Sequence, residues 1–268
     1  MPSNSRTPTA MTIAGSDSGG GAGIQADLKT FAVHGVFGTS AITAITAQNT
    51  LGVDRWVPVS PDMVTAQIDA VMRDIGADAI KIGMLATAPI VDVVADALER
   101  YASVPVVLDT VMVAKGGARL LDDEAVDLIR RRCLPRATVV TANLPEAAAL
   151  TGLTVQTPAD VRRAARALIE LGAKAALVKG GHLAGPPTDV LDDGEQAVTL
   201  RARRIETPHT HGTGCTLAAA IAAQLALGRP LVDAARRAKR YVTRAIAAAP
   251  GIGGGHGPLG WGPGLIGR

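Results

Sequence analysis

The chain has 268 residues, 47% of them hydrophobic, but only two each of Trp, Tyr and Phe, so its core must be built from aliphatic side chains. This length suits one compact domain. The net charge of +3 is spread over helix faces and few aromatic rings are present for base stacking, which argues against a nucleic-acid partner.

The two ends of the chain differ in composition from its body. Residues 1–10 are polar, contain two prolines and are predicted to form a flexible tail, so that residues 11–268 make up a single domain. Residues 250–268 are rich in Gly and Pro, which excludes a regular helix or strand. We expect this segment either to remain loose or to fold over a ligand as a lid, and the sequence favours neither strongly.

Neither a signal peptide nor a membrane span is evident in the sequence. Nothing before Thr12 resembles an apolar signal core, and no run approaches the roughly 20 apolar residues of a spanning helix. The two cysteines lie in dissimilar contexts, and Cys133 is predicted to be a small packed side chain. We therefore expect a cytoplasmic protein with no membrane partner.

Short β-branched or aliphatic runs alternate with Ala-rich helical stretches through the body of the chain. Strands are predicted at residues 12–14, 39–46, 79–82, 106–109, 138–140 and 175–178. Helices are predicted at residues 24–34, 62–75, 88–101, 123–134, 145–150, 159–171, 214–227 and 231–248. This alternation predicts an α/β fold with a mostly parallel sheet covered on both faces. The turn Asp192-Asp193-Gly194 predicts a small antiparallel hairpin appended late in the chain.

Polar residues follow the first two predicted strands, at the sheet edge where such folds bind ligands. The Gly-rich loop at residues 15–23 permits close backbone approach to a ligand, although it lacks the usual dinucleotide fingerprint and a Walker lysine. Gln48 carries an amide that both donates and accepts, which suits either the edge of a heterocycle or a capped turn.

Candidate metal and phosphate ligands follow the later strands. Asp109 is expected to orient a metal-bound water or to cap a turn. Asn143 and Glu146 would open the next helix, either as a capping box or as ligands of hydrated Mg²⁺. Lys179 leaves a buried strand toward the ligand edge, where phosphate is its natural partner.

The segment at residues 207–223 carries the strongest signal, because a Gly-Thr-Gly turn leads directly to Cys215 and into an Ala/Leu/Ile helix. Unpaired N–H groups and the helix dipole predict an anion site at such a helix start. The same field predicts a lowered pKa for the Cys215 thiol. His209 and His211 suggest zinc, but no further ligand at metal spacing accompanies them, so zinc is disfavoured.

Seven motifs occur along the chain in the order AGSDSGGGAGIQADLKT, ITAQNT, KIGML, VVLDTVM, NLPEAAAL, VKGGH and THGTGCTLAAA. Together they resemble the hydroxymethylpyrimidine/phosphomethylpyrimidine kinases of thiamin biosynthesis, within the ribokinase-like superfamily. The resemblance runs from about residue 12 to residue 257. It implies a ribokinase-like domain, commonly homodimeric, that transfers the γ-phosphate of MgATP to 4-amino-5-hydroxymethyl-2-methylpyrimidine and then phosphorylates the monophosphate to the diphosphate.

The resemblance also implies roles on the pyrimidine side of the reaction. Gln48 would bind the aminopyrimidine edge. Further pocket residues would be Gly15, Asp27 and Met84. Cys215 occupies the position of the catalytic base, where most ribokinase-like sugar kinases carry Asp, which argues against a sugar kinase.

On the nucleotide side, the resemblance implies that Lys179 lies near the phosphates. Asn143 and Glu146 match the magnesium and phosphate motif of the superfamily, and Asp109 is expected to join them at Mg²⁺ through water. The anion hole would be formed by Gly212, Thr213 and Gly214.

Two alternatives remain open at this point. A pyridoxal-type kinase acts on a similar flat heterocycle that carries a hydroxymethyl group, and a side activity of this kind is plausible. A non-catalytic pyrimidine sensor with a degenerate kinase domain is the other alternative. The intact Gly-Thr-Gly-Cys turn and Asn-x-x-Glu motif argue against the sensor.

Overall fold

The fold was analysed in a computed structural model, which describes residues 6–112, 121, 123–181, 183, 185–262 and 265. The first five residues of the expected tail lie outside the described part, as does most of the chain beyond residue 262.

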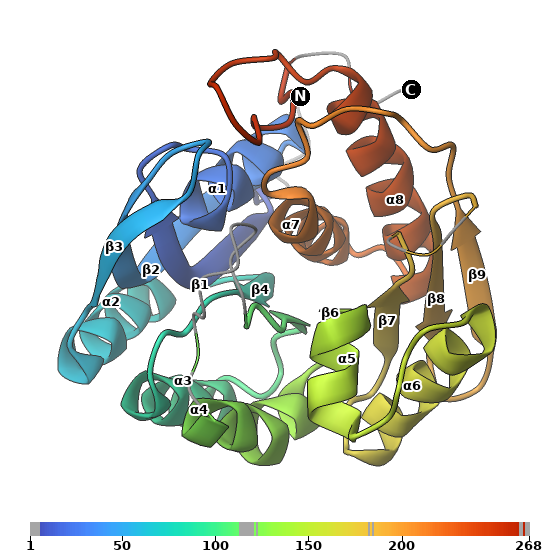
Figure 1. Cartoon of the computed structure of the whole chain (residues 1–268). Helices are drawn as coiled ribbons and strands as arrows, with labels where there is room; N and C mark the ends of the chain where they lie inside the picture. The colour runs from blue at the N-terminus through green and yellow to red at the C-terminus, as the bar shows by residue number, and fades with distance from the viewer. Residues whose placement is uncertain are drawn as a thin grey trace, which may run out of the picture.

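One sheet of nine strands crosses the described part of the chain (Figure 1). The strands are β1 (Thr9–Asp17), β2 (Phe37–Gln48), β3 (Val53–Pro58), β4 (Ala79–Ile82), β5 (Val106–Asp109), β6 (Val139–Asn143), β7 (Ala176–Lys179), β8 (Thr188–Asp192) and β9 (Ala197–Arg201). Their order is β3-β2-β1-β4-β5-β6-β7-β8-β9. Six adjacent strands of the sheet are parallel, namely β2, β1, β4, β5, β6 and β7. The outer strands β3, β8 and β9 pair with their neighbours in antiparallel fashion. The mostly parallel sheet and the late hairpin are thus confirmed.

Helices cover both faces of this sheet (Figure 1). On one face lie α1 (Gly23–Val33), α7 (Thr213–Ala226) and α8 (Leu231–Ala247). On the other lie α2 (Pro61–Asp74), α3 (Ala88–Arg100), α4 (Asp123–Leu128), α5 (Leu144–Thr151) and α6 (Pro158–Glu170). None of the described helices is long and apolar enough to cross a membrane.

Aliphatic side chains fill both layers, as the composition requires. One core cluster joins the sheet to α2–α6 and includes Cys133, which is fully buried as predicted. The other joins the sheet to α1, α7 and α8, where six successive residues from Ala218 to Ala223 have no exposed surface. Small alanine side chains allow α7 to lie close to the strands, and this brings its first turn to the carboxyl ends of β4 and β5.

The structure corrects three sequence expectations. The first strand begins at Thr9, so the expected tail is two residues too long, and the backbone N–H of Thr9 donates to Asp78 at 2.8 Å. Strand β3 was not predicted, because an edge strand that is mostly exposed has no clear apolar alternation. The sequence predicts one helix at residues 123–134, but α4 ends at Leu128. A π-helical turn at Ile129–Cys133 and a 3₁₀ turn at Leu134–Arg136 follow it.

The described part of the Gly/Pro segment packs against two distant loops. The N–H of His256 donates to the carbonyl of Thr50 at 2.8 Å, and the N–H of His211 donates to the carbonyl of Gly257 at 3.1 Å. A side chain at Gly255 would collide with the Thr50 carbonyl, so this close approach requires glycine. These contacts favour the folded alternative over a loose tail for residues 250–260.

Candidate active site

The first turn of α7 presents the predicted anion site at the edge of the sheet. Gly212 caps the helix in the left-handed region at φ 78°, and a Cβ there would collide with the carbonyl of Gly21, so only glycine fits. The N–H of Thr213 is occupied by the carbonyl of Thr210 at 3.4 Å. Within the turn, the N–H groups of Gly214 and Cys215 are those for which the helix supplies no acceptor.

Cys215 lies where the sequence predicts it, but its ionisation differs from the prediction. Its side chain is partly exposed, and the backbone N–H of Gly23 donates to the sulfur. Burial raises the pKa of the Cys215 thiol to about 11, and the nearby charge of Lys81 only partly offsets this. The lowered thiol pKa expected from the helix start is therefore wrong, because desolvation outweighs the Lys81 charge and the Gly23 hydrogen bond.

Three ionisable side chains meet beside this turn, and we call Asp109, Glu146 and Lys179 the charged side of the site. The Lys179 ammonium lies 3.1 Å from Asp109 Oδ1 and 3.9 Å from Glu146 Oε2. Burial alone lowers the pKa of Lys179, but the two carboxylates hold it above its usual value. A Cβ on Gly214 would lie 3.3 Å from the Lys179 nitrogen, so the bare glycine leaves this ammonium open toward the helix start.

The pKa values of Asp109 and Glu146 are shifted in opposite directions, although burial raises both. For Asp109, the charges of Lys179 and Lys81 and a 2.7 Å hydrogen bond from Thr141 outweigh burial and lower the pKa. For Glu146, burial and the neighbouring Asp109 charge prevail, and the pKa is raised. Both carboxyl groups face the same cation, the Lys179 ammonium.

Asn143 and Glu146 form a capping box at the start of α5. The N–H of Glu146 donates to Asn143 Oδ1, and the N–H of Asn143 donates to Glu146 Oε2, both at 2.8 Å. The sequence leaves a capping box and a Mg²⁺ site as alternatives, and the structure contains the capping box. Because Glu146 also faces Lys179, the same side chain reaches the charged side.

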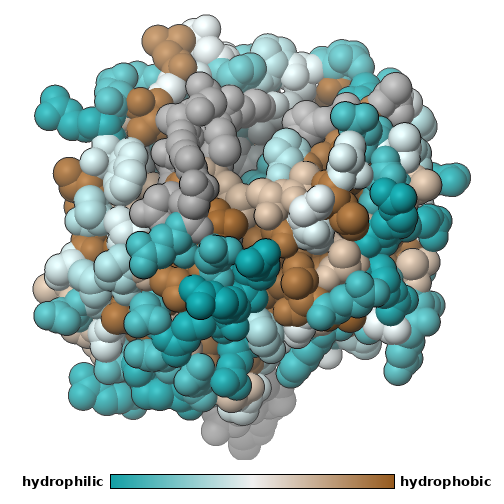
Figure 2. Space-filling view, turned by 60° about the horizontal axis from the view of Figure 1, so that its bottom comes forward, coloured by the Kyte–Doolittle hydropathy of each residue, from teal (hydrophilic) through white to brown (hydrophobic). Residues whose placement is uncertain are grey.

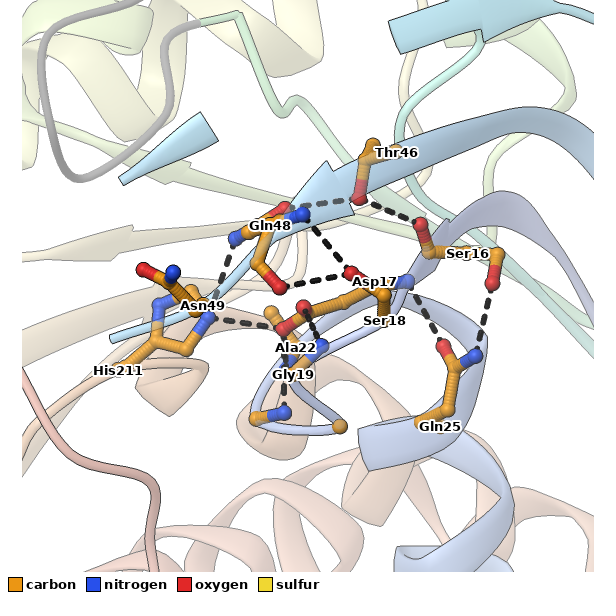
Figure 3. A network of polar contacts seen from close by, with 12 residues as sticks. Ser16, Asp17, Ser18, Gly19, Ala22, Gln25, Thr46, Gln48, Asn49 and His211 are labelled. Carbon is orange, nitrogen blue, oxygen red and sulfur yellow. Dashed lines mark hydrogen bonds and ion pairs between the residues drawn. The ribbon is translucent and has the colours of Figure 1, made fainter. Parts of the chain in front are cut away.

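At the other end of the sheet edge, Gln48 lies in a hydrogen-bonded network that we call the amide side, formed with Asp17, Thr46 and His211 (Figure 3). The Gln48 amide lies 3.2 Å from His211 Nε2 and 3.2 Å from Thr46 Oγ1. His211 Nε2 also lies 2.9 Å from Asp17 Oδ2. Loops 163 residues apart in the chain therefore hold Gln48 jointly.

Asp17 organises the Gly-rich loop. Its Oδ1 accepts the N–H of Gly19 at 2.8 Å, and its Oδ2 accepts those of Gly21 and Ala22 at 3.0 and 2.8 Å. Burial alone raises the pKa of Asp17, but the hydrogen bond from His211 and these N–H groups hold it below the usual value. The loop is thus ordered around a buried carboxylate.

The remaining predicted pocket residues separate into two groups. Gly15 and Met84 are in contact, since a Cβ on Gly15 would lie 3.1 Å from the Met84 sulfur. Asp27 was expected to line the pocket, but it has no exposed side-chain surface and instead forms an ion pair with Lys81 at 2.8 Å. Although burial lowers the pKa of Lys81, the Asp27 carboxylate holds it above its usual value.

The family described as phosphomethylpyrimidine kinase matches residues 17–260. The chain belongs to this family. The match includes both the charged side and the amide side, and the family and the ribokinase-like α/β fold expected from the sequence are confirmed.

Individual relatives agree with this assignment. Hydroxymethylpyrimidine/phosphomethylpyrimidine kinase of Synechococcus elongatus is 52% identical over 255 residues, which cover 94% of this chain and 97% of that protein. An ADP complex of Bacillus subtilis pyridoxal kinase has a TM-score of 0.88 at 40% identity and covers 95% of this chain and 97% of that one. Phosphomethylpyrimidine kinase from Clostridium difficile 630 has a TM-score of 0.80 at 40% identity, with coverages of 89% and 99%. The chain is a phosphotransferase.

The sequence motifs assign no role to three residues that the structure places beside the predicted site residues: Asp17, Lys81 and His211. Asp17 lay inside a loop noted only for its glycines, and Lys81 inside a strand. His211 was weighed only as a zinc ligand, whereas its observed partners are Asp17 and Gln48. A carboxylate two residues after a glycine at a strand end was the one available signal for Asp17.

The surroundings of the site are mixed in polarity. On the face that carries α3–α6, Figure 2 shows hydrophobic residues gathered around a hollow near the middle, framed by hydrophilic ones. Among the described residues, no group of three or more His, Cys, Asp or Glu side chains is arranged to hold a metal ion by itself.

Proposed function

We propose that this chain transfers the γ-phosphate of MgATP to the hydroxymethyl group of 4-amino-5-hydroxymethyl-2-methylpyrimidine, and then phosphorylates the monophosphate to the diphosphate, in thiamin biosynthesis. The observation that carries the proposal is the convergence of an amide side, a charged side and the open first turn of α7 at one sheet edge. The amide side can recognise a heterocycle and the charged side can hold phosphate. The first turn of α7 lies beside the Lys179 ammonium. Family membership supports the same reaction.

On the charged side, Lys179 is the proposed phosphate ligand. Its ammonium lies beside two carboxyl groups, and the bare Gly214 leaves it open toward the start of α7. The Gly214 and Cys215 N–H groups would bind the negative charge that develops on the transferred phosphoryl group. This refines the sequence hypothesis, since the Thr213 N–H is already in use.

Asp109, Asn143 and Glu146 are the residues we propose to hold hydrated Mg²⁺ through water. The donor set fits, because oxygen ligands suit this ion and Mg²⁺ keeps several waters of its own when bound beside substrate phosphates. Asp109 Oδ2 faces the bare Gly214, since a Cβ there would lie 3.8 Å away. When bound, the ion would offset charge on the β- and γ-oxygens of the nucleotide.

Cys215 is the proposed base for the first transfer. It adjoins the two free N–H groups, and the Lys81 charge favours its thiolate form. Because burial raises the pKa of this thiol, the proposed role requires Cys215 to lose its proton in the same step in which the alcohol attacks, or on substrate binding. The second transfer has a phosphate monoester as its nucleophile, whose second pKa is about 6, so it requires no base.

The deciding experiment is incubation of the purified protein with MgATP and the hydroxymethylpyrimidine, with phosphorylated products separated by ion-exchange chromatography. We expect the monophosphate to appear first and the diphosphate after it. Binding of the pyrimidine without ADP production would favour the sensor alternative and overturn the kinase proposal.

A second candidate substrate is pyridoxal. Support comes from the structural likeness to Bacillus subtilis pyridoxal kinase at 40% identity. Pyridoxal also carries a hydroxymethyl group on a flat ring, so the same transfer geometry serves both. Comparing kcat/KM for the two compounds tests this, and we expect the aminopyrimidine to be preferred because Gln48 presents both a donor and an acceptor.

We further propose a cytoplasmic homodimer built from a single domain that begins with β1 at Thr9. Exposed apolar side chains on the antiparallel β2–β3 pair support association, because Ile45 and Val57 are register partners and both lie about half exposed. The two free cysteines are consistent with a reducing compartment. Light scattering of the wild type and an Ile45→Glu variant tests the dimer, which the variant should dissociate.

A further inference from the structure

The hydrogen bonds of the amide side determine more than the position of Gln48. His211 Nε2 faces two groups at once, Asp17 Oδ2 at 2.9 Å and the Gln48 amide nitrogen at 3.2 Å (Figure 3). The nitrogen and oxygen of a glutamine amide exchange places by a half-turn of the terminal torsion, so which of them faces His211 follows from donor and acceptor counting.

Asp17 determines where the proton of His211 lies. Three backbone N–H groups donate to its two carboxylate oxygens, which identifies an ionised group that only accepts. Because Asp17 Oδ2 accepts, His211 Nε2 must carry a proton and donate. A Gln48 N–H turned toward the same nitrogen would place two donors face to face.

Thr46 leads to the same conclusion from the opposite end of the amide. Its hydroxyl has one proton, and the carbonyl of Ser16 at 2.9 Å is positioned to accept it. Thr46 Oγ1 is then left with lone pairs toward the Gln48 amide at 3.2 Å. An amide nitrogen satisfies this oxygen, whereas an amide oxygen would not.

We propose that His211, oriented by Asp17, is a positioning residue that fixes the Gln48 amide with its oxygen toward His211 and its nitrogen toward Thr46. Gln48 then offers a fixed order of groups, with an acceptor on the His211 side and a donor on the Thr46 side. His211 is itself held in place, since its backbone N–H donates to the carbonyl of Gly257. Its ring packs so closely on Gly21 that a side chain on that glycine would collide with it.

This fixed order determines specificity, an inference that rests on the proposed function. The 4-aminopyrimidine edge pairs a ring nitrogen that accepts with an amino group that donates, which matches a donor and an acceptor on Gln48. The 4-oxo analogue, in its N3–H form, presents the reverse pattern. An amide held in one orientation rejects the analogue, whereas a freely turning amide accommodates both.

The test compares two His211 variants of similar volume. His211→Gln retains an N–H near the position of Nε2, and His211→Met does not. With kcat/KM measured for the 4-amino compound and its 4-oxo analogue, we expect their ratio to fall at least about tenfold in the Met variant and to stay within about threefold of wild type in the Gln variant. The KM for ATP should stay unchanged in both, which with thermal unfolding verifies the fold.

Equal ratios in the Met variant and the wild type, or equal losses in both variants, would overturn the proposal. Failure of the wild type to phosphorylate either compound would instead overturn the proposed function. A second measurement is independent of turnover: NMR of the ¹⁵N-labelled wild type should show contacts between the Gln48 amide protons and the Thr46 methyl group. Contacts to the His211 ring protons in their place would overturn the orientation.

Discussion

The charged side and the amide side of the site lie on the same sheet edge but are built by different physical means. On the charged side, Lys179 lies within ion-pair distance of both Asp109 and Glu146. On the amide side, Gln48 lies within hydrogen-bond distance of Thr46 and His211, and His211 in turn contacts Asp17.

The difference follows from what each side must discriminate. A phosphate group carries charge and little directional information, so a cation that exchanges carboxylate partners for phosphate is sufficient. A heterocycle is nearly neutral and is distinguished by the order of its hydrogen-bonding groups. We therefore expect substitutions on the charged side to affect ATP and those on the amide side to affect the pyrimidine.

The largest effect should come from Lys179→Met on the charged side. The variant loses the phosphate ligand and leaves Asp109 and Glu146 as two facing carboxylates, so kcat/KM for ATP should fall about 10³-fold. Steady-state kinetics with both substrates varied would measure this, with Lys174→Met as the exposed control before the same strand. An equal rise in the KM for the pyrimidine would contradict the assignment of ATP binding to the charged side and pyrimidine binding to the amide side.

Cys215 lies between the two sides, and Cys215→Ala should slow the first phosphorylation about 10²-fold while affecting the second much less. The reason is that only the alcohol nucleophile needs a base. Single-turnover rates for each step would measure the effect. Cys133→Ala, far from the site, should leave the ratio of the two rates unchanged, and equal losses at both steps in Cys215→Ala would remove Cys215 from the base role.

The raised pKa of Cys215 leads to a prediction for the free protein. With a pKa of about 11, its thiolate is scarce at neutral pH, so alkylation by iodoacetamide should be at least about 100-fold slower than for an ordinary cysteine. The rate should rise with pH up to a midpoint near 11. Peptide mass spectrometry distinguishes alkylation of Cys215 from alkylation of Cys133. A midpoint below pH 8 would contradict the raised pKa and support the lowered thiol pKa expected from the helix dipole.

The smallest effect should come from Thr46→Val on the amide side. The variant removes one neutral hydrogen bond to Gln48, so the KM for the pyrimidine should rise about 3- to 10-fold with the KM for ATP unchanged. Thr39→Val, on the same strand, removes a hydroxyl whose partner is the carbonyl of Ala10 at 3.5 Å and serves as the control. A larger effect on ATP than on the pyrimidine would contradict the assignment.

Local patterns were sufficient to predict most of the fold and the charged side. Aliphatic runs identified the parallel strands, and polar residues at strand ends identified Asp109 and Lys179, which the structure brings within 3.1 Å of each other. Parallel strands align their carboxyl ends at one edge, so proximity followed from topology alone.

The contacts of the amide side and the pKa of the Cys215 thiol depend on residues that lie far apart in the sequence, so local patterns did not predict them. His211 is 194 residues from Asp17 and 163 from Gln48, and no periodic pattern links them. Lys81 and Asp27 are 54 residues apart, so the sequence predicts Asp27 as a pocket residue without its ion-pair partner Lys81. The ionisation of Cys215 depends on burial by surrounding elements, which a helix-start motif cannot reveal.

The contact between Gly212 and Gly21 has an evolutionary consequence. A Cβ on Gly212 would collide with the carbonyl of Gly21, and a Cβ on Gly21 would collide with the His211 ring. Gly212 is blocked by a backbone atom that no substitution at Gly21 removes, whereas Gly21 is blocked by a side chain that substitution can remove. Laboratory libraries that seek to redirect this scaffold should therefore keep Gly212 and vary Gly21 only together with His211.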